Sequence, residues 1–192
     1  SDVVVRDFHP LRVAAVERLC ADAVAVTFDV PAELAERYRF RPGQSLTVRR
    51  GGERRTYSIC APAGARPRIG VREVPGGLVS SWLVHDVRPG TRIDVQTPTG
   101  AWNADPDAGE RHLLVAAGSG ITPLLSIAAT VLAHPDAHVS LLYGNRTSGT
   151  VMFAEELGDL KNRYGPRLQI AHVLSREPRE AELFSGRLDR DK

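Results

Sequence analysis

Four consecutive residues, Arg55-Thr56-Tyr57-Ser58, carry side chains that could bind a flat ring bearing a phosphate. They begin a predicted strand, in which Arg55 and Tyr57 point to one face and Ser58 to the other, because successive side chains alternate. A guanidinium can bind a phosphate through two parallel hydrogen bonds. A phenol ring can stack on a flat ligand and donate a hydrogen bond. Exposed Arg-x-Tyr pairs also occur on strands without any ligand, and the pattern alone leaves that alternative open.

A glycine-rich loop precedes a helix predicted over 79–85. Its residues are Gly76, Gly77, Leu78, Val79 and Ser80. Glycines let a ligand approach the backbone closely, and the N–H groups of a first helical turn bind anions. The loop therefore suits a phosphate or diphosphate. A capping serine would explain the same residues without a ligand.

A second glycine-rich turn lies between a strand predicted over 112–117 and a helix predicted over 123–133. It consists of Gly118, Ser119, Gly120, Ile121, Thr122 and Pro123. Thr122 is the expected N-cap, and Pro123 is the expected first helical residue. This is the position of a dinucleotide-binding turn, but Pro123 replaces the third glycine of the G-x-G-x-x-G pattern. A tight strand-to-helix turn is the alternative.

Two further sites bear on the choice of coenzyme. The next predicted strand, 139–143, is followed by Asn145 and Arg146, where an NAD-binding protein would carry an acidic residue. Ser175 and Arg176 follow a third predicted strand, 168–174. Basic residues at these strand ends favour the 2′-phosphate of NADP over NAD. Exposed loop arginines without a ligand remain the alternative.

Composition excludes several classes. The 192 residues carry a net charge of only +2, which does not indicate a nucleic-acid partner. Cys20 and Cys60 are too few to hold an iron–sulfur cluster, and no metal site is expected. No apolar run approaches the ~20 residues of a membrane helix. We expect no membrane association and a cytoplasmic location.

These side chains must be positioned by two kinds of element. Before a turn-rich stretch at 105–109, short period-two runs alternate with Gly and Pro turns, which predicts an antiparallel six-stranded barrel with one helix. The predicted strands are 11–19, 24–30, 46–48, 56–60, 68–74 and 92–96. After it, a β-α-β-α-β rhythm predicts a partial parallel sheet, with a second helix over 150–163. We place domains at 1–107 and 108–192.

The order of these motifs along the chain resembles the ferredoxin–NADP reductase family, over essentially the whole sequence. Within it, the turn at 144–147, the helix from Phe153 to Leu160 and the ending at 186–189 are most similar to oxygenase reductases of the phenylacetyl-CoA epoxidase type. The family's nucleotide domain has more parallel strands than the three predicted here. We therefore expect this domain to be C-terminally incomplete. In the epoxidase type, a domain with a two-iron two-sulfur cluster follows.

The resemblance implies roles for particular residues. Arg55 would bind the phosphate region of FAD, Tyr57 would pack on the flavin, and Ser58, as the catalytic residue, would hydrogen-bond near flavin N5. The loop containing Gly77 and Ser80 would hold the FAD diphosphate. The turn from Gly118 to Pro123 would shape the NADP and nicotinamide site.

The resemblance thus implies an NADPH-dependent, FAD-containing electron-transfer reductase. It would pass electrons to an iron–sulfur centre, beyond residue 192, and to an oxygenase component or ferredoxin. Two alternatives stay open: a stand-alone flavin or ferredoxin reductase, and a non-catalytic flavin-binding module of a larger complex.

Overall fold

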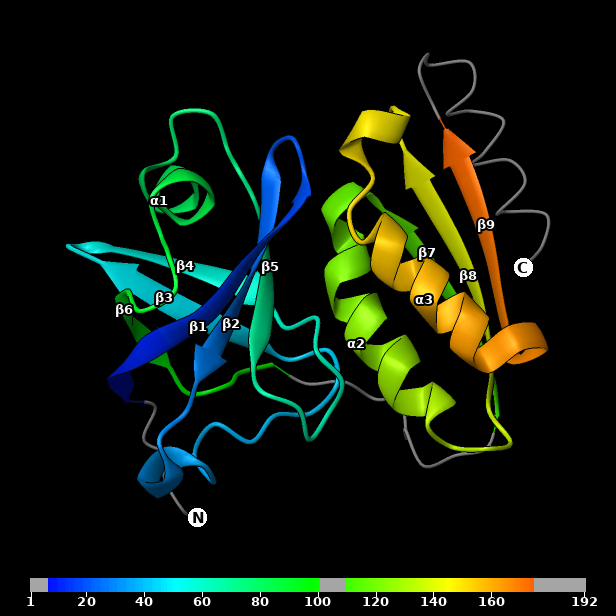
Figure 1. Cartoon of the computed structure of the whole chain (residues 1–192), viewed down its shortest axis with the longest axis horizontal. Helices are drawn as coiled ribbons and strands as arrows, with labels where there is room; N and C mark the ends of the chain where they lie inside the picture. The colour runs from blue at the N-terminus through cyan, green and yellow to red at the C-terminus, as the bar shows by residue number, and fades with distance from the viewer. Residues whose placement is uncertain (1–6, 101–109, 175–192) are drawn as a thin grey trace.

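A computed structural model describes residues 7–100 and 110–174. Two sheets form two units that lie side by side (Figure 1). The domain boundary predicted at 107/108 and the ending at 186–189 both lie outside the described residues. Within the described residues, no helix is both long enough and apolar enough to cross a membrane.

The first unit is an antiparallel six-stranded sheet with the strand order β4-β3-β6-β1-β2-β5. Its strands are β1 (Phe8–Cys20), β2 (Ala23–Asp29), β3 (Ser45–Arg50), β4 (Glu53–Ser58), β5 (Arg68–Arg72) and β6 (Arg92–Gln96). The two edge strands approach each other where Ile59, just after β4, bridges Ile69 of β5. The predicted antiparallel barrel is confirmed.

Alternate side chains of the strands fill the core of the barrel. Val24, Val26 and Phe28 of β2 are fully buried in its core, as their alternation predicts. The helix α1 (Leu78–His85) adds Val79 and Leu83 to the same core. Strand β4 begins three residues before the predicted start, because the hairpin turn lies at 51–52, where Gly51 adopts φ 59°.

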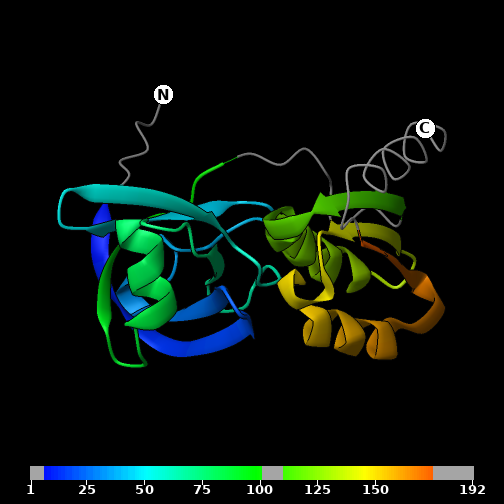
Figure 2. The same cartoon turned by 90° about the horizontal axis from the view of Figure 1, so that it is seen from above.

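The second unit is a parallel sheet with the order β7-β8-β9. Its elements are β7 (Arg111–Ala117), α2 (Ile121–Leu132), β8 (His138–Asn145), α3 (Ala154–Tyr164) and β9 (Leu168–Leu174), with a 3₁₀ turn at Gly118–Gly120 and another at Ser148–Thr150. The predicted β-α-β-α-β order is confirmed. Both helices cover the same face of the sheet (Figure 2).

Helix α1 begins one residue before its predicted start, and the starts of α2 and α3 differ more. Helix α2 begins at Ile121 with Gly120 as N-cap, so Thr122 is not the cap and Pro123 is the third helical residue. The Thr122 hydroxyl donates instead to the carbonyl of Ser119 (2.9 Å), which lets the 3₁₀ turn run straight into the helix. Helix α3 begins at Ala154, because Phe153 takes a left-handed conformation (φ 63°) that places its ring in the core.

The apolar run at 112–117, which forms most of strand β7, is of a kind typical of parallel strands buried on both faces, but here only one face is covered. Leu114 and Ala116 are buried under the helices, whereas Leu113 and Val115 are 60% and 45% exposed. The helices among the described residues cover only one face, so alternate side chains of an apolar run face outward. A continuous apolar run is therefore compatible with a parallel strand that is buried on one face only.

Glycine in the middle of α3 offers a test of this helix. Gly158 is exposed, and a Cβ built there meets no atom within 4 Å. We expect Gly158→Ala to raise the free energy of unfolding by about 0.5–1 kcal/mol, because alanine loses less backbone entropy in a helix. Chemical unfolding of the chain measures this. Gly165→Ala is the matched control: its φ of +57° strains any side chain, so it should destabilise. Stabilisation by both changes would contradict the assigned end of α3.

Candidate functional site

Residues from both units line one cavity of about 380 Å³. The barrel contributes Thr56, Tyr57 and Ser58, and the second unit contributes Ser119 and Thr122. Two separately predicted motifs, at the end of β4 and at the turn before α2, thus meet at the junction between the sheets. The remaining lining residues come from β5 and the loop after it: Gly70, Arg72, Glu73, Val74 and Pro75.

Tyr57 is the largest aromatic group of this cavity. Its ring is half-buried and packs against the barrel core. Burial raises the pKa of the phenol, and the charge of Arg55 opposes this only in part. The phenol is therefore neutral at physiological pH and can donate a hydrogen bond. A half-buried ring with a polar tip suits a flat, partly polar ligand.

Arg55 and Thr56 are more exposed than Tyr57. The Arg55 guanidinium pairs with the Glu53 carboxylate at 3.0 Å and lies outside the cavity lining. The Thr56 hydroxyl lies 2.7 Å from that of Thr47 on the neighbouring strand β3. Arg55 is thus held beside the cavity by a solvent-exposed pair that an incoming phosphate can displace at little cost.

The loop before α1 closes on itself. The Gly77 N–H donates to the Val74 carbonyl (2.7 Å), and the Ser80 hydroxyl accepts from the Val74 N–H (3.0 Å). Ser80 is the third residue of α1, and the N-cap is Gly77. The capping-serine alternative is therefore wrong, although Ser80 does stabilise the loop. A Cβ at Gly77 would lie 2.6 Å from the Ser80 hydroxyl, which explains that glycine without a ligand.

Other members of this loop differ in exposure. Val79 is buried in the barrel core, whereas Leu78 is 63% exposed. Gly76 has φ 76°, which accounts for a glycine there. Val74 and Pro75 carry the loop to the cavity wall, so the first turn of α1 begins close to the cavity.

The turn before α2 leaves space that the protein does not fill. Gly118 needs its glycine for φ 54°. Gly120 has an ordinary φ of −61°, and a Cβ there would meet nothing within 4 Å. Neither strain nor packing explains the missing side chain at Gly120. Open space beside the N–H groups that begin a 12-residue helix fits the phosphates of a nucleotide.

Asn145 and Arg146 lie at the same edge of the parallel sheet as this turn, because the pairing aligns Ala117 with Gly144 and Asn145 with Leu174. The Asn145 side chain is 6% exposed, and neither of its amide atoms has a hydrogen-bond partner among the described residues. Arg146 is exposed. Ser175 and Arg176 lie outside the described residues.

Five residues of the cavity lining were not predicted from the sequence: Gly70, Arg72, Glu73, Val74 and Pro75. The Arg72 guanidinium donates to the Thr150 carbonyl at 2.6 Å, and Glu73 is paired with His85 of α1. Arg68, Gly70 and Arg72 recur at every second position of β5. That spacing of polar and small residues opposite buried Ile69 and Val71 was the available signal.

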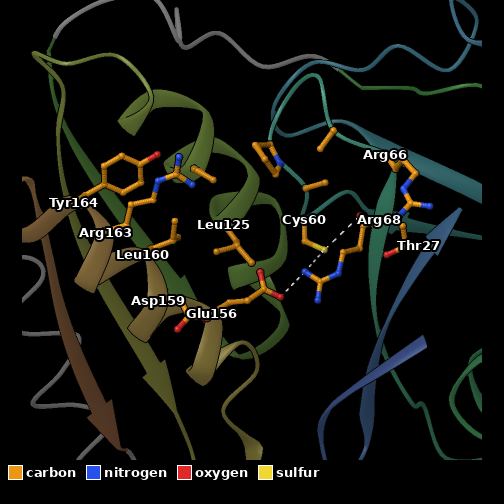
Figure 3. A pocket seen from close by; sticks show the side chains of 14 residues that line it. Thr27, Cys60, Arg66, Arg68, Leu125, Glu156, Asp159, Leu160, Arg163 and Tyr164 are labelled. Atoms are coloured by element: carbon orange, nitrogen blue, oxygen red, sulfur yellow. Dashed lines mark hydrogen bonds and ion pairs between the residues drawn. The ribbon is translucent and has the colours of Figure 1, made fainter. Parts of the chain in front are cut away.

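A second cavity, of about 440 Å³, contains none of the predicted site residues (Figure 3). It lies between the barrel and the helices α2 and α3, beside Cys60, Arg68 and Glu156. Burial raises the pKa of the Cys60 thiol to about 12, so this cysteine is a packing residue. Within 7–100 and 110–174, no cluster of three or more His, Cys, Asp or Glu could hold a metal ion.

Comparison with known proteins agrees with this geometry. Residues 10–104 match the family described as "Oxidoreductase FAD-binding domain", and residues 114–192 match the "Oxidoreductase NAD-binding domain". The neutral Tyr57 ring and the open space at Gly120 fit a flavin and a nicotinamide nucleotide, respectively.

Curated relatives include one of the subunits of 1,2-phenylacetyl-CoA epoxidase from Escherichia coli (strain K12), which is 44% identical over 96% of this chain and 54% of the relative. The ferredoxin reductase component of 3-ketosteroid-9-alpha-monooxygenase from Rhodococcus rhodochrous is 36% identical over 85% of this chain and 48% of the relative. The chain thus spans about half the length of these relatives.

Solved structures show the same fold. The Amycolatopsis cytochrome P450 reductase GcoB has a TM-score of 0.74 and 27% identity, over 90% of this chain and 54% of that one. Phthalate dioxygenase reductase has a TM-score of 0.73 and 28% identity, over 89% and 53%. With a FAD-binding barrel followed by a nicotinamide-nucleotide-binding sheet, the chain belongs to the ferredoxin reductase family of oxidoreductases.

Proposed function

We propose that this chain is the FAD- and NADPH-binding part of an electron-transfer reductase that serves an oxygenase of the phenylacetyl-CoA epoxidase type. The observation that carries the proposal is the single cavity lined by both Tyr57-Ser58 and Ser119-Thr122. A site that must bring a hydride donor and its acceptor together needs groups from both domains. The proposed domains are 1–107 and 108–192, and the cytoplasm, where NADPH is available, is the proposed location.

The barrel residues would bind and orient the flavin, which when bound accepts a hydride and releases electrons one at a time. Tyr57 offers its half-buried ring for packing. Ser58, in the cavity wall, is the proposed hydrogen-bond donor near flavin N5. Arg55 would leave Glu53 to bind a phosphate oxygen. The first turn of α1, behind Gly76 and Gly77, would bind the diphosphate.

The second domain would bind the coenzyme. The open space at Gly118 to Gly120 and the first turn of α2 would hold the phosphates, with Thr122 and Pro123 fixing the turn. The amide of Asn145, buried and without a partner among the described residues, lies at the same sheet edge and would hydrogen-bond the nucleotide. Arg146, with Ser175 and Arg176, would contact the 2′-phosphate.

Electrons would then leave toward an iron–sulfur centre and an oxygenase component. With two cysteines in its 192 residues, this chain does not supply the thiolates of such a centre. We propose that residues outside this sequence hold the cluster. The relatives that belong to oxygenase systems support this order of transfer.

The direct test is the visible spectrum of the full-length protein loaded with FAD, followed by anaerobic addition of NADPH. We expect bound-flavin absorption that bleaches on mixing. A protein that takes up no FAD would refute the flavin assignment. A protein that binds FAD but never bleaches, with NADPH or NADH, would refute the reductase and support a flavin-binding module.

A smaller change tests the nucleotide turn. We expect Gly120→Ala to weaken NADP⁺ binding by about tenfold, because the new methyl group fills ligand space, at a typical overpacking cost of ~1–3 kcal/mol. The melting temperature should not fall, since no protein atom is near and alanine loses less backbone entropy on folding. Gly52→Ala in the β3–β4 hairpin is the matched control, where a Cβ also meets nothing within 4 Å. Unaltered NADP⁺ affinity in Gly120→Ala would place the nucleotide elsewhere.

The coenzyme choice is tested at Arg146. We expect Arg146→Ala to weaken NADPH use, with NADH use nearly unchanged, because a charged hydrogen bond to the 2′-phosphate contributes ~1.5–3 kcal/mol. Steady-state kinetics with both coenzymes measures the ratio. Arg111→Ala, at the opposite edge of the same sheet, is the control and should change neither value. Equal losses with NADPH and NADH would refute the role of Arg146.

A further inference from the structure

Strand β5 has two chemically different faces. Ile69 and Val71 are fully buried in the barrel core. Arg68, Gly70 and Arg72 occupy the alternate positions, which therefore point away from that core toward the second domain. The register sets Ala25 of β2 beside Gly70, and Ala25 is buried in the core of the second domain. The face is therefore small in its middle and cationic at both ends.

The middle of this face permits a close approach. A Cβ at Gly70 would lie 2.7 Å from Thr122 Cγ2, 2.9 Å from Thr122 Oγ1 and 3.2 Å from Phe153 Cζ. The first turn of α2 and the left-handed residue before α3 both rest on this glycine. Thr122 also lines the proposed flavin and nucleotide cavity. The contact at Gly70 therefore sets how near the Gly118 to Pro123 turn lies to the Tyr57 strand.

Arg68 and Arg72 each contact both domains. Each is held on the barrel side by an acid: Arg68 by Glu17 (2.7 Å) and Arg72 by Asp22 (3.6 Å). Each also reaches the second domain, where Arg72 donates to the Thr150 carbonyl (2.6 Å) in the turn that follows Arg146.

Arg68 makes the corresponding contact at the other end of the face. Its guanidinium pairs with Glu156 of α3 and lies 5.7 Å from the centre of the Phe153 ring. Figure 3 shows Arg68 and Glu156 pointing toward each other across the seam. With 12% of its side chain exposed, Arg68 is the more enclosed partner of both of its ion pairs.

We propose that Arg68, Gly70 and Arg72 form an interdomain joint that fixes the distance between the flavin-binding strand β4 and the nucleotide-binding turn, and that Arg68 is a positioning residue for hydride transfer. The joint rests on the proposed function. Hydride transfer needs the reacting atoms within ~3–3.5 Å, and a misplacement of ~1 Å can slow it about a hundredfold. Arg68 lies outside the cavity lining, so its role is one of positioning and not of direct contact with the ligands.

The experiment compares Arg68→Ala, Arg68→Lys and Glu156→Gln in the full-length, FAD-loaded protein. Three quantities are measured: the Kd for FAD, the rate of flavin bleaching at saturating NADPH, and hydrogen exchange of the amides of the first turn of α2 without nucleotide. We expect Arg68→Ala to bleach about tenfold to a hundredfold more slowly with an unchanged Kd for FAD and faster amide exchange. Arg68→Lys should recover part of the rate, because an ammonium keeps the charge but not the two-sided fork.

Arg66→Ala is the matched control, because the ion pair of Arg66 is with Asp29 of its own domain (2.7 Å), and this variant should bleach at the normal rate. Glu156→Gln changes the joint from the other domain and should slow bleaching even if Arg68→Ala does not fold.

Normal bleaching in both Arg68→Ala and Glu156→Gln would overturn the joint, as would a parallel loss of FAD binding. If the unaltered protein never bleaches, the proposed function fails, and unchanged amide exchange in the variants would then overturn the joint independently.

Discussion

The close approach of α2 and Phe153 to Gly70 sets how the two domains fit together. One face of the barrel takes part in the core of the second domain. Ala23 and Ala25 of β2 are buried in that second core, while Val24, Val26 and Phe28 fill the barrel. Strand β2 is therefore buried on both faces, and its two sets of side chains pack into the cores of the two domains.

Hydrogen bonds around this apolar interface restrict the relative orientation of the two domains. Ser126 of α2 donates to the Ala61 carbonyl (2.6 Å), and the Ala63 N–H donates to Thr130 (3.0 Å). Both bonds join the second domain to the loop after β4, the strand that ends with Tyr57 and Ser58. The bond of Ser126 is buried and that of Ala63 is exposed. Directional hydrogen bonds at two points of one interface together favour a single relative orientation of the two domains.

Some of the cavity residues could be predicted from the sequence and others could not. Tyr57, Ser58, Ser119 and Thr122 stood in short motifs next to turns, where local backbone geometry is readable from residue type. Gly70 and Arg72 stood in a strand without a motif, and only their neighbours in space make them cavity residues. Even within a motif, one detail was wrong: Thr122 is not the N-cap of α2, because the 3₁₀ turn continues into the helix.

The two architectures and their order could be predicted from the sequence, because hydrophobic periodicity and turn residues act within a few neighbouring positions. The predicted bounds of β6 and β9 match the structure at both ends. The covered face of β7, the first residues of the helices and the meeting of β5 with α2 at Gly70 could be learned only from the three-dimensional structure. These depend on contacts between residues far apart in the chain, and no local pattern encodes which surfaces will meet.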